Sequence, residues 1–272
     1  MTFADRHRLL TDYVGGGADP ADPAQVLAMP VVLHIEKNDP PPRRALLEAA
    51  ARAAVLLCLD ERADAVAPDA ADPDPATPNA APPAPGPWHD GVATWCDARI
   101  RKISRRARGA HWVAAQEVAG LTVDTGEAQA RAIVPGPVGD LDKRIARLQI
   151  GGTDVDGDLD ADPTSPGELI LWINPTLDMT VGKLAAQVGH ASMLAAGLFD
   201  TAEALRWWRD GCPLEVAVAS EAAWSDLLRR GPDSVAPVRD AGFTEVAPGS
   251  VTVIAERALT APQDRTLGSL HE

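Results

Sequence analysis

The chain has 272 residues, of which 46% are hydrophobic, enough to build a core in one or two domains. Its 39 acidic and 25 basic side chains give a formal net charge of -14. This balance excludes a protein that holds nucleic acid through bulk positive charge. No apolar run approaches ~18 residues, the first residues lack the apolar core of a signal peptide, and the three cysteines are widely spaced. We therefore expect a cytoplasmic protein without a membrane segment.

Residues 1–150 are predicted to form an N-terminal α/β domain. Residues 30–36, PVVLHIE, are typical of a strand, and the alanine- and leucine-rich residues 42–60 are typical of a buried helix. Residues 64–87 contain eight prolines and little that could be buried, which predicts a disordered insertion. Residues 88–116 are predicted to be helical, and two strands, 118–124 and 128–134, follow around a hairpin turn.

Six basic side chains are concentrated within ten positions of the predicted helix over 88–116. They are Arg99, Arg101, Lys102, Arg105, Arg106 and Arg108. One interpretation is a solvated helix face that offsets an acidic domain. The other is a strip that contacts RNA phosphates, in which Arg105 and Arg106 bind the substrate.

A second break, residues 151–167, carries five aspartates at alternate positions. A calcium-binding EF-hand starting at Asp154 would need Gly at position 159 and Glu at position 165, where the chain has Leu159 and Ser165. We therefore interpret this segment as an acidic linker between domains. The following pattern predicts strands over 168–174, 214–219, 235–239 and 251–255, and helices over 180–198, 201–210 and 220–230. Residues 168–272 should thus form a compact α/β domain, a small mixed sheet covered by helices.

Several catalytic motifs are excluded in this domain. The sequence around Gly182 lacks the glycine and hydroxyl residue of a phosphate-binding loop, no G-x-S-x-G elbow occurs, and His190 has no zinc-binding partner. We expect no metal and no cofactor. Lys183, Gln187 and His190 share one face of the predicted helix, and Asp240 ends a strand before a tight turn. A purely structural interpretation remains open for each: a surface lysine, a turn-capping aspartate and strand-forming threonines.

Two motifs in this domain resemble those of type II peptidyl-tRNA hydrolases, G-K-x-A-A-Q-x-x-H-A and D-A-G-x-T-x-[IV]-x-P-G-[ST]-x-T. The matching residues are Gly182-Lys183, Ala185-Ala186-Gln187, His190-Ala191, Asp240-Ala241-Gly242, Thr244, Pro248-Gly249-Ser250 and Thr252. The resemblance covers about residues 168–258. It implies metal-independent hydrolysis of the ester between peptide and tRNA by a domain that usually dimerises. It places catalytic residues at Lys183, Asp240, Thr244 and Thr252, and we expect substrate contacts from Gln187, His190, Ser250, Arg105 and Arg106.

These residue types suit ester cleavage, because an ammonium stabilises a developing oxyanion and a carboxylate can hold that ammonium or accept a proton from water. Which residue is the base stays open. The family's turn K-M-x-K-G-K is replaced by DMTVGK at residues 178–183, so two lysines expected near RNA phosphates become Asp178 and Val181. Two alternatives therefore remain: a non-catalytic binding or regulatory protein with the same fold, and an esterase for another acylated substrate.

The N-terminal half repeats the strand–turn–helix order and also closes with two strands. We hypothesise that residues 30–150 are a degenerate copy, so that one chain forms a pseudo-dimer, and a homodimer stays open as the other assembly. The alternative is an unrelated α/β domain. The N-terminal half contains no D-A-G-x-T motif and should have no active site of its own.

Overall fold

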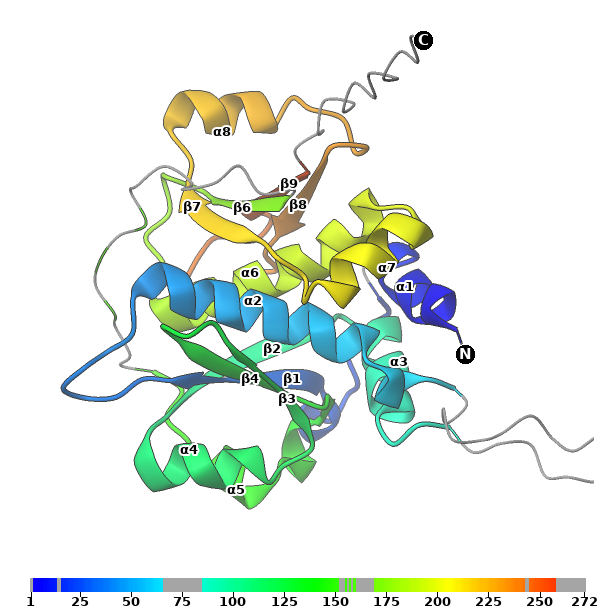
Figure 1. The fold of residues 1–272 in the computed structure, drawn as a ribbon, viewed down its shortest axis with the longest axis vertical. Helices are drawn as coiled ribbons and strands as arrows, with labels where there is room; N and C mark the ends of the chain where they lie inside the picture. The colour runs from blue at the N-terminus through cyan, green and yellow to red at the C-terminus, as the bar shows by residue number, and fades with distance from the viewer. Residues whose placement is uncertain are drawn as a thin grey trace, which may run out of the picture.

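The computed structural model describes residues 2–13, 16–65, 85–151, 155, 157, 159, 169–242 and 245–257. Most of the predicted insertion (64–87) and of the acidic linker (151–167) lies outside these residues. The described chain forms two mixed sheets with helices between them and on their outer faces (Figure 1). α/β architecture is therefore confirmed for both parts of the chain.

The first sheet belongs to the N-terminal half and has the strand order β2-β1-β4-β3, with the short β5 also paired to β1. β1 and β2 run parallel, whereas the β1–β4 and β3–β4 pairs are antiparallel. The elements of this half are α1 Phe3–Thr11, β1 Leu27–His34, α2 Arg43–Leu59, α3 His89–Asp97, β2 Arg101–Ala107, α4 Gly109–Gln116, β3 Gly120–Asp124, β4 Gln129–Ile133, β5 Gly136–Pro137 and α5 Lys143–Ala146. Predicted strands over 30–36, 118–124 and 128–134 and the helix over 42–60 are confirmed.

The prediction of one continuous helix over residues 88–116 is wrong. α3 ends at Asp97, Ile100 adopts a left-handed backbone conformation with φ of 41°, and the chain then enters β2. A right-handed helix cannot continue through such a residue. Seven consecutive residues of β2 then pair with β1, and this long-range pairing outweighs the local preference of an arginine-rich segment.

The second sheet, in the C-terminal half, has the order β7-β6-β9-β8. β6 and β7 are parallel, and the β6–β9 and β8–β9 pairs are antiparallel. Its elements are β6 Leu169–Ile173, α6 Val181–Ala195, α7 Thr201–Arg209, β7 Glu215–Val218, α8 Glu221–Leu227, β8 Val235–Arg239 and β9 Val251–Arg257. Every strand and helix predicted for this half is confirmed, although α8 ends three residues earlier than expected.

The two sheets therefore share one topology. In each half a parallel pair of strands is followed by a hairpin whose second strand pairs with the first strand of the half. Leu33 of β1 pairs with Arg106 of the parallel strand β2 and with Ala130 of the antiparallel strand β4. Leu171 of β6 likewise pairs with Val216 of the parallel strand β7 and with Ala255 of the antiparallel strand β9.

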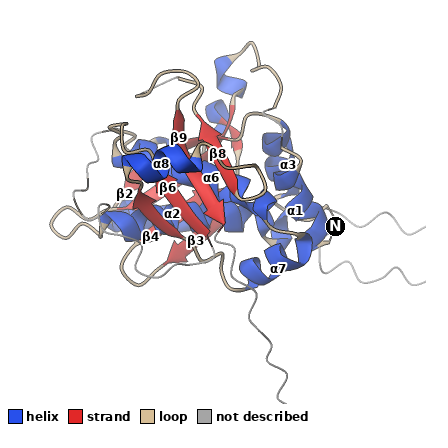
Figure 2. Ribbon diagram, turned by 90° about the horizontal axis from the view of Figure 1, so that it is seen from above, coloured by secondary structure: helices blue, strands red, loops and turns tan. Residues whose placement is uncertain are grey.

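α2 and α6 lie side by side between the two sheets, and α8 and the α4–α5 pair cover the outer faces (Figure 1). Small side chains let the two central helices approach closely. Ser192 Oγ of α6 donates a hydrogen bond to the carbonyl of Ala51 in α2 at 2.8 Å, and a Cβ placed on Gly189 would lie 3.4 Å from Ala54 Cβ. α1, α3 and α7 gather at one end of the sheets (Figure 2). None of the described helices has the length and apolar character needed to cross a bilayer.

Glu48 of α2 joins the halves at the outer strand of the second sheet. Its Oε1 accepts a hydrogen bond from the backbone N of Val216 in β7 at 3.1 Å. Burial, together with the neighbouring Glu215 carboxyl, raises the pKa of Glu48 to about 6, although the Val216 hydrogen bond and nearby arginines act in the opposite direction.

Replacing Glu48 with glutamine should stabilise the fold above pH 6. The folded protein binds the Glu48 proton more tightly than the unfolded chain, so wild-type stability falls as pH rises from 4.5 through 6. The amide does not titrate and can still accept the Val216 hydrogen bond. We expect Glu48→Gln to gain about 1 kcal/mol relative to wild type over this window, a value reduced for partial solvation. Urea unfolding at pH 4.5 and near pH 7.5 measures this gain, and a difference that does not change with pH would contradict it.

Candidate active site

Lys183 and Asp240, two of the predicted catalytic residues, form an ion pair. Lys183 lies in the first turn of α6, whose N-cap residue Thr180 accepts a hydrogen bond from the backbone N of Lys183 at 3.3 Å. Asp240 follows β8, where its backbone N donates to the carbonyl of Ser250 at 2.9 Å. Lys183 Nζ is 2.5 Å from Asp240 Oδ2, and the two side chains are 10% and 9% exposed. The pair therefore lies just below the surface, with a small part of each group open to solvent.

Gln187 and Thr252 support this pair from the interior. Gln187 follows Lys183 by one helical turn, and its Nε2 donates to Asp240 Oδ2 at 2.9 Å. Its Oε1 accepts a hydrogen bond from Thr252 Oγ1 at 2.5 Å, and Gln187 and Thr252 are both buried. The hydroxyl donor on one side and the carboxylate on the other determine which way the amide faces. The four side chains form a continuous hydrogen-bonded series from the core to the surface.

Gly242 completes the environment of Asp240. Its backbone N donates to Asp240 Oδ1 at 2.7 Å, in a tight turn where Gly242 has φ of 79°. A Cβ at this position would lie 2.4 Å from Pro248 Cγ, so glycine is required for both its conformation and its size. This explains the spacing of the D-A-G motif and its later proline in physical terms.

The loop between β8 and β9 holds the remaining predicted residues and one that the sequence did not reveal. Thr244 lies outside the described residues, so its role stays a prediction. Ser250 is half-buried and contacts Asp240 through its backbone carbonyl. Glu245, which no motif specifies, accepts two hydrogen bonds from Thr180, from its backbone N at 2.9 Å and from its Oγ1 at 2.8 Å. A carboxylate in the motif loop and a threonine before the helix were the only sequence signals for this contact.

His190 lies at the interface between the halves rather than beside Asp240. Its Nδ1 is 3.5 Å from Lys102 Nζ of β2. Burial, with the charges of Lys102 and Lys183, lowers the pKa of His190 well below its ordinary value, which keeps the ring neutral. A substrate contact by His190 therefore stays a prediction.

Arg105 and Arg106 are engaged within the N-terminal half. Arg105 is 8% exposed, and its guanidinium donates to the carbonyls of Ala146 and Leu148, both at 2.9 Å. The backbone N of Arg106 donates to the carbonyl of Gln149 at 2.8 Å. These contacts hold residues 146–149 against β2, and contact of either arginine with a substrate stays a prediction.

The two positions where the family has further lysines differ from each other. Asp178 is exposed on the loop before α6. Val181, in contrast, is fully buried as the first residue of the helix. Only Asp178 therefore presents a changed charge to solvent, whereas Val181 contributes to the core.

The arrangement provides a positive charge and a carboxylate in contact, both partly open to solvent. Such a pair can stabilise an oxyanion and orient a water molecule. Among the described residues, no group of three His, Cys, Asp or Glu side chains is placed to share a metal ion.

The site defines an α/β domain with a lysine–aspartate pair close to its surface, and comparison with known sequences identifies the family. The family described as "Peptidyl-tRNA hydrolase PTH2" matches residues 168–270. A peptidyl-tRNA hydrolase of Nanoarchaeum equitans is 38% identical over 91 residues, which cover 29% of this chain and 75% of that protein. One of Staphylothermus marinus is 31% identical over 94 residues, covering 31% of this chain and 76% of that protein. The chain belongs to the PTH2 family of peptidyl-tRNA hydrolases, through its C-terminal half.

Removing the Thr252 hydroxyl should destabilise the interior of the site. Thr252→Val leaves Gln187 Oε1 buried without its donor, which should lower the free energy of unfolding by ~1–3 kcal/mol. Thr252→Ser retains the hydroxyl and should cost about 1 kcal/mol through the lost methyl group. Urea unfolding followed by tryptophan fluorescence compares the two variants. A valine variant as stable as wild type would show that the hydrogen bond contributes nothing.

Proposed function

We propose that this chain hydrolyses the ester between the peptide and the 3′ ribose of peptidyl-tRNA, releasing tRNA for reuse. The ion pair of Lys183 and Asp240 between α6 and the β8–β9 hairpin is the observation that carries the proposal. Membership of the PTH2 family and the names of the two relatives support it. Because peptidyl-tRNA arises in translation, we place the protein in the cytoplasm.

Lys183 and Asp240 have different roles in the proposed reaction. Lys183 supplies positive charge where the ester carbonyl oxygen becomes an oxyanion, a contribution typically worth ~3 kcal/mol. Asp240 holds the ammonium through Oδ2, and its Oδ1, which accepts a hydrogen bond from Gly242, has capacity for another donor. A water at Oδ1 is oriented there and gives one proton to the Asp240 carboxylate as its oxygen attacks the carbonyl carbon. The bond to the ribose oxygen then breaks, and that oxygen takes the proton. No step in this scheme needs a metal.

In this scheme Gln187 orients the Asp240 carboxylate, and Thr252 orients Gln187. Both side chains are buried, so a substrate reaches Asp240 and Lys183 before it reaches either of them. Their hydrogen bonds orient the carboxylate for both of its partners. Thr252 is therefore a positioning residue, whereas the resemblance alone placed it among the catalytic ones.

A second candidate function is hydrolysis of another acylated substrate. Exposed Asp178 places negative charge on the loop before α6, and Arg105 is engaged inside the N-terminal half, so neither residue supplies positive charge for RNA phosphates. A substrate with fewer phosphates would not be repelled in this way.

We also infer that the N-terminal half is a degenerate copy of the C-terminal one, so that residues 1–150 and 168–272 form a pseudo-dimer joined by residues 151–167. When α2 and α6 are aligned from their first residues, Ala51 corresponds to Gly189 and Ala54 corresponds to Ser192. Ala51 contacts Ser192 and Ala54 contacts Gly189, so the two contacts are exchanged when the halves are exchanged. Together with the shared strand order, this is the pattern of an isologous interface.

The copy differs where the active site would be. The pairing of β3 with β4 ends at Asp124 and Gln129, where their hairpin turn begins. The pairing of β8 with β9 extends further, to Arg239 and Val251. The shortened hairpin lacks positions for a second Asp240 and Thr252, and helix matching aligns Lys183 with Ala45.

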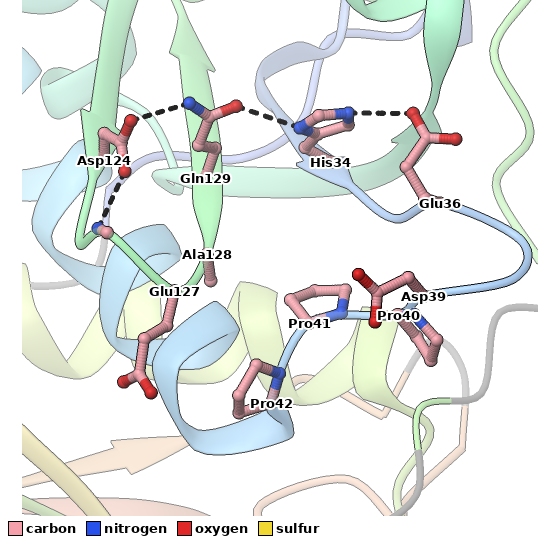
Figure 3. A pocket seen from close by; sticks show the side chains of 11 residues that line it. His34, Glu36, Asp39, Pro40, Pro41, Pro42, Asp124, Glu127, Ala128 and Gln129 are labelled. Atoms are coloured by element: carbon pink, nitrogen blue, oxygen red, sulfur yellow. Dashed lines mark hydrogen bonds and ion pairs between the residues drawn. The ribbon is translucent and has the colours of Figure 1, made fainter.

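A cavity of about 430 Å³ occupies the corresponding place in the N-terminal half, between the β1–α2 loop and the β3–β4 turn (Figure 3). Four carboxylates line it, from Glu36, Asp39, Asp124 and Glu127. Gln129 bridges Asp124 and His34, which in turn contacts Glu36. This acidic lining disfavours an RNA phosphate, which agrees with a single hydrolytic site in the chain.

Lys183→Ala should lower peptide release from N-acetylated aminoacyl-tRNA by ~100-fold or more, because one oxyanion-stabilising donor is lost. The matched control is Lys143→Ala, an exposed lysine in α5 that should leave release unchanged. Release should persist in a metal chelator.

The same assay separates the alternatives. Absence of release by the wild type would refute the proposed function and favour a binding protein. Cleavage of simple acyl esters without release from tRNA would favour the second candidate. Full activity in Lys183→Ala would show that the site is assigned to the wrong residue.

The pseudo-dimer proposal predicts one hydrolytic site and one tRNA per chain, on a species with the 28.6 kDa mass of a single chain. Light scattering coupled to gel filtration measures the mass. Titration with a non-hydrolysable peptidyl-tRNA analogue measures the stoichiometry. A stable dimer that binds two tRNAs across a joint site would contradict the proposal.

A further inference from the structure

Glu245 connects the two segments that supply the ion pair. It lies on the hairpin loop five residues after Asp240, and both of its carboxylate oxygens accept hydrogen bonds from Thr180, at 2.9 Å and 2.8 Å. Thr180 in turn caps α6 in front of Lys183. Glu245 is therefore bonded to the end of the helix that carries the ammonium, while its own loop carries the carboxylate.

Two bonds to one residue fix both the distance and the orientation of the loop. Charge-assisted bonds of this kind are stronger than neutral ones, and a carboxylate at a helix N-terminus also interacts favourably with the helix dipole. Lys183 and Asp240 are 57 positions apart in the chain, so their 2.5 Å contact depends on such long-range connections. Loss of the Glu245 bonds would leave the loop with more freedom to move away from α6.

Glu245 also contributes negative charge next to the first turn of α6. Glu245 is exposed to solvent, and so is Asp178, which lies two positions before Thr180. Two carboxylates therefore flank the first turn of α6, beside Lys183 and the guanidinium of Arg43, which donates to the carbonyl of Met179 at 3.3 Å. Each carboxylate offsets part of this positive charge and so weakens the attraction of an RNA phosphate to the turn.

We propose that Glu245 is a positioning residue for the hydrolytic reaction and that its charge limits affinity for the RNA part of the substrate. This proposal rests on the proposed function. The two effects act on different kinetic parameters. Geometry of the Lys183–Asp240 pair affects kcat, whereas the repulsion of phosphates affects KM.

Two substitutions separate these effects. Glu245→Gln keeps a side chain that can bond Thr180 but removes the charge, so kcat should stay within ~2-fold while KM for N-acetylated aminoacyl-tRNA falls ~3-fold at low salt. The fall in KM should disappear at about 0.5 M salt because the repulsion is screened. Glu245→Ala removes the bonds as well, and kcat should fall ~10-fold. The matched control is Glu61→Gln, an exposed carboxylate after the far end of α2, which should change neither parameter.

Hydrogen exchange tests the contact without relying on activity. In Glu245→Ala, peptides covering residues 176–184 and 240–250 should exchange faster, while the rest of the protein exchanges as in wild type. Unchanged exchange and unchanged kcat in this variant would overturn the positioning role. A KM for Glu245→Gln equal to that of wild type at low salt would overturn the electrostatic role. Faster exchange in a protein whose wild type releases no peptide would support the contact and refute the proposed hydrolysis.

Discussion

Close packing of α2 against α6 is the contact on which both halves of the molecule depend. Each helix covers its own sheet and presses on the other helix, so the two sheets are held at a fixed separation (Figure 1). Small residues make this approach possible: a Cβ on Gly189 of α6 would lie 3.4 Å from the Cβ of Ala54 in α2. Because α6 also carries Lys183 and Gln187, the interface between the halves determines where the polar face of the site lies.

The strands other than β2 and β5, together with α2 and α6, could be predicted from the sequence because burial gives each of them a local pattern. The two motifs indicated that Lys183 and Asp240 would meet. The prediction of a helix over 88–116 was wrong because β2 pairs with β1, whose residues lie far away in the sequence. The same reason explains why burial of Val181 and the bonds of Glu245 were not foreseen. Helical periodicity placed Gln187 next to Lys183 but could not show that it would bond to Asp240 and Thr252 together.

The chain is strongly acidic, and the ammonium group of Lys183 lies in a partly enclosed position within it. Lys183 is held by Asp240, whose carboxylate accepts hydrogen bonds from three donors within the described residues. Enclosure strengthens the field of such a charge, because less water screens it. The chemistry proposed for the site therefore depends on this one ammonium group, which contacts the carboxylate directly.

The interface between the two sheets is formed within one polypeptide, and this has a thermodynamic consequence. An interface between separate subunits dissociates on dilution, so the stability of its site varies with protein concentration. Here α2 and α6 are joined covalently through the intervening chain, and their association is a unimolecular step. The folded arrangement around α6 should consequently be as complete at nanomolar concentrations as at micromolar ones, and scarcity of the protein in a cell would not disassemble it.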